Sequence, residues 1–224
     1  MTSQRRDLVL LSGGLDSTTA LALRHEHCTA RLAVSVYYGQ RHARELEAAA
    51  KVAAHYGVEL RIVDLTAWGQ HLTGSALTDP EVAVPHGQYD SPTMAATVVP
   101  NRNATFLMAA AGIAQAVGCT HVVTAVHAGD HPVYSDCRPE FVDAARRTVE
   151  LGTDGAVTVD APFVTMSKTA IVARGFDLNA PLDLTWSCYE GRQAHCGQCG
   201  TCVERREAFT EAGVIDPTRY EVAA

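Results

Sequence analysis

Short apolar runs alternate with amphipathic stretches along most of this chain. The runs predict strands at residues 8–11, 32–37, 60–64, 121–126 and 157–161. Helical periodicity between them predicts helices at residues 17–25, 43–56, 104–117, from 139 onward, at 167–173 and at 203–212. Strands that alternate with helices at this spacing indicate βαβ units. The pattern therefore predicts an α/β fold, a Rossmann-like parallel sheet with helices on both faces.

Two stretches break this alternation. Residues 66–96 are rich in Gly, Pro, Asp and Ser, and residues 185–202 are loop-like with four cysteines. An irregular segment as long as the first is usually a functional lid or an insertion. At 224 residues the chain suits one domain. We therefore expect a single domain over residues 1–224, with a small metal-binding segment at residues 185–212.

A glycine turn follows the first predicted strand and precedes the first predicted helix. Its sequence is Ser12-Gly13-Gly14-Leu15-Asp16-Ser17. Backbone N–H groups freed by two glycines, together with the positive end of a helix, form a cradle for an anion. Neither Gly-Lys-Ser/Thr nor Gly-x-Gly-x-x-Gly is present. Since an acidic residue repels phosphate unless a cation lies between them, Asp16 points to a pyrophosphate bridged by Mg²⁺.

This hexapeptide resembles the signature of the PP-loop ATP pyrophosphatases, which cleave ATP between its α and β phosphates and adenylate a substrate. The alternative is a strand-to-helix turn in which the glycines serve packing alone. It does not explain why Asp16 and two serines stand beside Gly-Gly. The resemblance implies an adenine nucleotide alpha hydrolase-like fold. It also implies that ATP binds to Leu11, Ser12, Gly13, Gly14, Leu15, Asp16, Ser17, Thr18, Thr19, Ala20 and Leu21.

Four of the seven cysteines lie close together near the end of the chain, as Cys188-x7-Cys196-x2-Cys199-x2-Cys202. An odd number of cysteines with four crowded together argues against a disulfide framework. Four thiolates at this spacing suit a tetrahedral structural Zn²⁺ site. An iron–sulfur cluster accepts the same ligands. His195 is an alternative to one thiol, but Cys188 completes an all-sulfur set.

Further motifs narrow the family. They are residues 37–42, residues 99–103, Asp130 with residues 134–141, Lys168, and residues 185–189. In this order they resemble the 7-cyano-7-deazaguanine synthases of the QueC type over nearly the whole chain. The chain departs from the pattern at residues 131–133, at Ser135 where a proline is more usual, and in the long stretch at residues 66–96.

The QueC resemblance implies an ATP-dependent, zinc-binding ligase on the route to queuosine. Its substrates are 7-carboxy-7-deazaguanine, ammonia and ATP with Mg²⁺, and its product is the nitrile. Because hydroxide is a poor leaving group, the family adenylates the carboxyl group to form an amide, then activates the amide oxygen to form the nitrile. The resemblance also implies a homodimer.

The resemblance assigns roles to particular side chains. Asp16, Ser17, Lys168 and Arg102 are the expected catalytic residues, and Lys168 would reach phosphate as a point charge. Arg102 offers a planar fork for the substrate carboxylate or for a phosphate. A deazaguanine carries N–H donors that Asp130 or Asp136 would accept, and Tyr134 would stack on its ring. The full set of expected substrate-binding residues is Arg102, Asn103, Asp130, Tyr134, Asp136 and Arg138.

Net charge and apolar pattern bear on the competing functions. The formal net charge of -7 disfavours a stable nucleic-acid interface, and with it a PP-loop tRNA-thiolating enzyme or a zinc module that binds nucleic acid. An enzyme that stops at the amide fits the same motifs. No signal-peptide pattern and no apolar run of membrane-spanning length occur in the sequence. We therefore expect a cytoplasmic protein.

Overall fold

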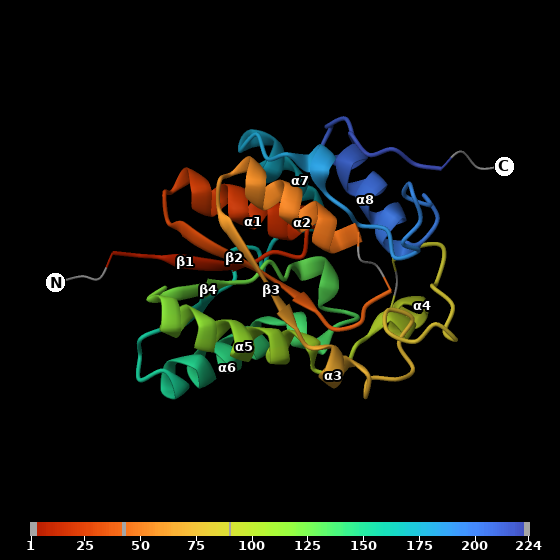
Figure 1. The fold of residues 1–224 in the computed structure, drawn as a ribbon. Coiled ribbons are helices and arrows are strands. Elements are labelled where there is room, and N and C mark those ends of the chain that lie inside the picture. Colours follow the sequence, from red (N-terminus) through yellow and green to blue (C-terminus); the bar gives the residue numbers. More distant parts are fainter. Residues whose placement is uncertain (1–3, 42–43, 90, 222–224) are drawn as a thin grey trace.

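Five parallel strands form one sheet at the centre of the computed structural model, which describes residues 4–41, 44–89 and 91–221 (Figure 1). In sheet order they are β3 (Glu59–Asp64), β2 (Ala30–Tyr37), β1 (Asp7–Leu10), β4 (His121–Val123) and β5 (Thr158–Asp160). All pairings are parallel, and Leu8 of β1 lies opposite Leu32 of β2 and Val122 of β4. The predicted parallel sheet is confirmed.

Helices cover both faces of the sheet, as predicted (Figure 1). One face carries α1 (Leu15–Glu26), α2 (Arg44–His55), α7 (Lys168–Asp177) and α8 (Gly200–Glu211), and the other carries α5 (Arg102–Val117) and α6 (Pro139–Gly152). Successive strand residues point to opposite faces. Accordingly Val9 packs in the core under α1 and α2, whereas Leu8 packs in the core against α5. The predicted start of α2 at Ala43 lies outside the described residues.

The chain changes direction across the sheet between β1 and β4. The connections β1–α1–β2 and β2–α2–β3 run on one face, and α5 and α6 flank β4 on the other. In such sheets the crevice beyond the carboxyl ends of the strands, at the point where the strand order reverses, is the usual ligand site. The glycine turn at the end of β1 lies at this crevice.

The stretch at residues 66–96 is packed against the rest of the molecule. Its described residues hold two one-turn α-helices, α3 (Thr66–Gly69) and α4 (Ser91–Met94), and the start of a 3-10 helix (Ala95–Thr97). Leu77 is buried beside Tyr38 at the end of β2, and Val84 packs among the C-terminal cysteines. The insertion therefore joins the crevice to the cysteine segment.

The C-terminal segment returns to the glycine turn before α8 begins. The backbone N–H of Trp186 donates to the carbonyl oxygen of Gly13 at 2.9 Å. Arg205 in α8 is fully buried and donates to the hydroxyl of Thr185 at 2.8 Å and to the carbonyl of Leu182 at 3.1 Å. These contacts hold the cysteine segment against the crevice. Within the described part of the chain, no helix has the length and apolar character needed to cross a membrane.

Candidate functional site

A cavity of about 250 Å³ opens at the carboxyl edge of the sheet. Its walls come from the ends of β1, β2 and β4, the starts of α1, α2, α5 and α7, and the C-terminal segment up to α8. Segments from both halves of the chain therefore build one site.

The two glycines of the turn have different reasons to be there. Gly13 has a φ of +86°, and a Cβ on it would lie 2.3 Å from the carbonyl oxygen of Glu45. This glycine thus has the packing purpose that the sequence did not reveal. Gly14 is the N-cap of α1 and provides no side-chain cap. The first N–H groups of α1 therefore have no capping side chain and are available to an anion.

Serine hydroxyls hold the turn in shape. The N–H of Ser12 donates to Ser17 Oγ at 3.2 Å, and the N–H of Gly14 donates to Ser12 Oγ at 3.2 Å. Of the residues expected to bind ATP, six line the cavity: Leu11, Ser12, Gly14, Leu15, Asp16 and Ser17. Residues 18–21 are fully buried in the first turns of α1 and do not line it.

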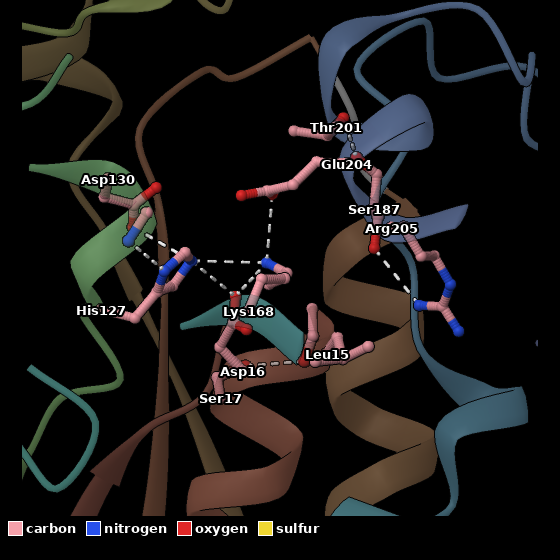
Figure 2. Close-up of polar contacts among 12 residues, drawn as sticks. Leu15, Asp16, Ser17, His127, Asp130, Lys168, Ser187, Thr201, Glu204 and Arg205 are labelled. Carbon is pink, nitrogen blue, oxygen red and sulfur yellow. Dashed lines mark hydrogen bonds and ion pairs between the residues drawn. The ribbon is translucent and has the colours of Figure 1, made fainter. Parts of the chain in front are cut away.

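Five charged or titratable side chains meet around Lys168 (Figure 2). We call Asp16, His127, Asp130, Lys168 and Glu204 the lysine group. Lys168 Nζ lies 2.7 Å from Asp16 Oδ2, 3.5 Å from Glu204 Oε2 and 3.5 Å from His127 Nε2. His127 Nε2 lies 3.5 Å from Asp130 Oδ2. Asp16 and Lys168, 152 positions apart in the chain, are thus brought into one ion pair.

Backbone and tyrosine contacts orient this group. The N–H of Gly129 donates to His127 Nδ1 at 3.1 Å, so in neutral His127 the ring proton is on Nε2, facing the carboxylates. The Tyr89 hydroxyl, from the insertion, donates to Asp130 Oδ1 at 3.0 Å. Asp130 is therefore held on two sides.

Charge pairing decides the ionisation of the lysine group. Burial disfavours ionised Asp16, yet the Lys168 ammonium and His127 outweigh burial and lower the pKa of Asp16. Burial works against charged Lys168 as well, but Asp16 and Glu204 raise its pKa. Burial raises the pKa of Glu204 against the opposing effect of Lys168. Asp16 and Lys168 are therefore both charged at neutral pH.

One oxygen of this group has no protein partner. Asp16 Oδ1 is buried and receives no hydrogen bond from any described residue. A buried carboxylate oxygen without a donor is a costly arrangement. Carboxylate oxygens are the ligands that Mg²⁺ prefers, usually together with substrate phosphates. The residues at this position therefore fit a cation that arrives with a polyphosphate.

A second set of side chains lines the cavity beyond β2. We call Tyr38, Glu45, Arg102 and Phe106 the arginine group. The Arg102 guanidinium and the Tyr38 hydroxyl interact electrostatically, and the Tyr38 and Phe106 rings lie 5.3 Å apart between centroids. Burial raises the pKa of Glu45 to about 7, and the nearby Arg102 charge opposes that rise. Arg102 is half-buried and lines the cavity.

The remaining predicted substrate residues divide into two sets. Asn103 and Tyr134 line the cavity, where the Tyr134 hydroxyl lies 2.6 Å from Thr97 Oγ1. Asp136 Oδ2 accepts the backbone N–H of Asn103 at 2.9 Å and so caps the start of α5. The exposed Arg138 donates to the carbonyl of His131 at 2.9 Å. Neither Asp136 nor Arg138 lines the cavity.

The four C-terminal cysteines form a compact, buried set. The sulfur atoms of Cys188, Cys196, Cys199 and Cys202 all lie within 4.8 Å of one another. The backbone N–H of Cys196 donates to Cys188 Sγ at 3.3 Å, and that of Cys199 donates to Cys196 Sγ at 3.2 Å. Such N–H···S contacts stabilise thiolates around a metal. The set therefore suits one tetrahedral ion with sulfur ligands.

His195 is occupied elsewhere. Its Nε2 accepts the backbone N–H of Ser187 at 3.1 Å, and its ring packs on Trp186 at 4.3 Å between centroids. Burial lowers the pKa of His195 to about 4. The all-sulfur set is therefore the better metal site of the two alternatives.

Sequence reasoning did not assign four side chains that line the cavity, namely Glu45, Tyr89, His127 and Glu204. The sequence positions of Glu45, His127 and Glu204 indicate that they lie near the site. Glu45 stands in the first turn of a helix that follows a parallel strand, and His127 follows β4 at the same sheet edge. Glu204 lies two residues after Cys202. The places of Glu45 and His127 are predictable as sheet-edge positions, but the direction of each side chain is not.

Comparison with known proteins gives a consistent result. Residues 6–213 match the family model described as "Queuosine biosynthesis protein QueC". A protein named 7-cyano-7-deazaguanine synthase from Rhizobium etli is 52% identical over 221 residues, covering 96% of this chain and 92% of that protein. The protein of the same name from Chelativorans sp. is 49% identical over 222 residues, covering 98% of this chain and 95% of that protein.

A solved structure shares the fold. NMN synthetase from Francisella tularensis superposes with a TM-score of 0.53 over 98% of this chain and 79% of that chain, at 16% sequence identity. At this identity the likeness concerns the fold alone.

Proposed function

The chain belongs to the QueC family of 7-cyano-7-deazaguanine synthases, and from this premise we propose that it converts 7-carboxy-7-deazaguanine and ammonia to 7-cyano-7-deazaguanine at the expense of ATP. The observation that carries the proposal is a single cavity in which the open end of α1 and the Asp16–Lys168 pair lie together with the half-buried guanidinium of Arg102. Such a cavity can hold a polyphosphate and a carboxylate together.

The reaction consists of two activations of the same carbon. The substrate carboxylate attacks the α-phosphorus of ATP and pyrophosphate leaves. Ammonia then displaces AMP to form the amide. In the second round the amide oxygen attacks a second α-phosphorus, pyrophosphate leaves again, and loss of AMP with the two amide protons gives the nitrile. Both carboxyl oxygens thus depart in AMP, and no water is consumed or formed.

The lysine group serves the phosphate part of this reaction. The N–H groups at the start of α1 bind phosphate oxygens, and Lys168 neutralises their charge as pyrophosphate leaves. Mg²⁺ supplies further neutralisation when it is bound, and Asp16 Oδ1, the oxygen without a donor, would hold it. Ser17 keeps the turn in place through Ser12. These roles position charge and need no covalent nucleophile.

Side chains on the other part of the cavity hold the substrate. Arg102 binds the 7-carboxylate in its planar fork. Asn103 stands beside it at the start of α5, and Tyr134 offers a ring for stacking. Asp130 is tied to His127 and Tyr89, so in this proposal it orients the lysine group and does not bind the base.

The cysteine set is proposed to hold a structural Zn²⁺, because its four buried sulfurs leave no position for a substrate. The metal would fix the segment that contributes Ser187, Tyr189, Thr201 and Glu204 to the cavity wall. A homodimer, as the family resemblance implies, and a cytoplasmic location complete the proposal. Analytical ultracentrifugation tests the dimer.

Mass spectrometry tests the proposed reaction. The protein is incubated with 7-carboxy-7-deazaguanine, ATP, Mg²⁺ and ammonium. The expected product has lost two oxygens and gained one nitrogen, and AMP and pyrophosphate accumulate. A product that stops at the amide would contradict the second round, and no change in the base would contradict the assignment altogether.

A further inference from the structure

Four carboxylates line the described part of the cavity, and they are not equivalent. Asp16 and Glu204 face Lys168, and Asp130 accepts the Tyr89 hydroxyl. Glu45 is the exception, since no hydrogen bond or ion pair joins it to another described residue. A half-buried carboxylate that faces a cavity without a protein donor is available to the donors of a ligand.

The surroundings of Glu45 limit what that ligand is. Tyr38 and Arg102 line the cavity together with Glu45, and Arg102 is close enough to oppose the rise in the pKa of Glu45. The Tyr38 and Phe106 rings, 5.3 Å apart, form an aromatic wall. The aromatic wall suits a flat heterocycle. The Arg102 cation would contact a hydrogen-bond acceptor on that heterocycle, and the Glu45 carboxylate would accept hydrogen bonds from donors beside it.

The guanine edge has this order of groups. Along one side of a 7-deazaguanine lie the 7-substituent, the O6 acceptor, the N1–H donor and the 2-amino donor. N1–H and the 2-amino group are two parallel donors that match the two oxygens of a carboxylate. Adenine presents a 6-amino donor beside the N1 acceptor. Its 6-amino group could donate to one carboxylate oxygen, but the lone pair on N1 would face the other oxygen and be repelled by it. The carboxylate therefore favours guanine over adenine.

We infer that Glu45 is the specificity residue that accepts N1–H and the 2-amino group of the deazaguanine, while Arg102 beside it contacts O6 and the 7-carboxylate. This role rests on the proposed function, because it concerns the substrate of that reaction. It replaces the expectation that Asp130 or Asp136 accepts these donors, since both carboxylates are already engaged within the protein.

Substitution of Glu45 tests the inference. Glu45→Gln keeps the shape but places an amide N–H₂ against a substrate donor. We expect the KM for 7-carboxy-7-deazaguanine to rise about 10- to 100-fold, the range for losing a hydrogen bond to a charged group, while the KM for ATP stays within about twofold. Glu47→Gln is the matched control, because Glu47 is exposed on the same helix.

A substrate analogue adds a second readout. The 7-carboxy-7-deazahypoxanthine analogue lacks the 2-amino group. The native protein should turn it over with a kcat/KM about 10- to 100-fold lower, and Glu45→Gln should lose most of this discrimination. If Glu45→Gln does not fold, Glu45→Asp is measured in the same assays. This variant keeps the negative charge, but its shorter side chain places the carboxylate farther from the base.

The outcomes distinguish a failure of the proposed function from a failure of the role of Glu45. A native protein that does not convert 7-carboxy-7-deazaguanine contradicts the proposed function. A native protein that converts it, with a Glu45→Gln variant of unchanged KM and unchanged discrimination, overturns only the role of Glu45. A rise in the KM for ATP alone also overturns that role, because it would place Glu45 at the nucleotide.

Discussion

The two groups of charged side chains in the cavity are built in opposite ways. In the lysine group each carboxylate has a cation or a hydroxyl within the protein, and Lys168 is shared between Asp16 and Glu204. In the arginine group no described residue donates a hydrogen bond to Glu45, and aromatic rings replace the network of ion pairs.

The difference reflects what each group must bind. A polyphosphate carries several negative charges, so its site needs cations and N–H groups that are held in place before it arrives. A neutral flat base needs a few directed acceptors and donors against an apolar wall. The lysine group, with its many ion pairs, thus forms the phosphate end of the cavity. The arginine group, with few, forms the base end.

The largest effect is expected at the phosphate end. Asp16→Asn removes the negative charge that holds Lys168 and that would attract Mg²⁺. We expect AMP formation to fall about 100- to 1,000-fold, while the fold is retained. Asp177→Asn, at an exposed site on α7, is the control. Retained activity in Asp16→Asn would remove the basis for assigning this end to phosphate.

Loss of the metal should affect both ends together. The cysteine segment contributes Glu204 beside Lys168 and Tyr189 to the cavity wall. Cys199→Ser should therefore abolish zinc binding and lower the free energy of unfolding by several kcal/mol, because structural zinc contributes to folding. Elemental analysis and thermal unfolding check this, with Cys28→Ser, an exposed cysteine, as the control. Iron in place of zinc, or no metal in the native protein, would contradict the assignment.

A pH dependence should belong to the base end alone. Binding of 7-cyano-7-deazaguanine without ATP requires ionised Glu45, whose pKa burial raises to about 7 against Arg102. Below that pKa the carboxyl group is protonated and cannot accept two donors, so affinity should rise roughly tenfold from pH 6 to pH 8, in proportion to the ionised fraction. Calorimetry across this range checks it. A slope that persists in Glu45→Gln would point to another group.

The smallest effect is expected outside both ends. Asp136→Ala removes the carboxylate that accepts the N–H of Asn103 at the start of α5. The expected cost is about 1 kcal/mol of stability, typical of a lost helix cap, with an unchanged KM for the base. Denaturant unfolding and steady-state kinetics measure the two quantities. A rise in the KM for the base without loss of stability would instead support the expected role of Asp136 in binding the base.

Much of this arrangement follows from the sequence because it depends on local pattern. The alternation of apolar runs and helices predicts the parallel sheet, and the cysteine spacing predicts the compact sulfur set. β4 ends at Val123, three residues before the predicted strand end, because the chain leaves the sheet to bring His127 to the cavity.

Other parts depend on contacts between distant segments and are not readable from the sequence. Asp136 is equally suited to a ligand or to a cap until α5, 33 positions away, is seen to start beside it. Gly13 shows its packing role only where the Glu45 carbonyl approaches it. Glu45 is one of several acidic residues in a helix start, and what distinguishes it is a place in the cavity wall without a partner among the described residues.

Oxygen labelling tests whether this cavity activates the same carbon twice. 7-Carboxy-7-deazaguanine labelled with ¹⁸O at both carboxyl oxygens is converted with ATP and ammonium, and the nucleotide products are analysed by mass spectrometry. Two activations of one carbon should give two AMP per nitrile, each carrying one ¹⁸O, and no label in pyrophosphate or water. A single labelled AMP with the second ¹⁸O retained in an amide or released to water would contradict it.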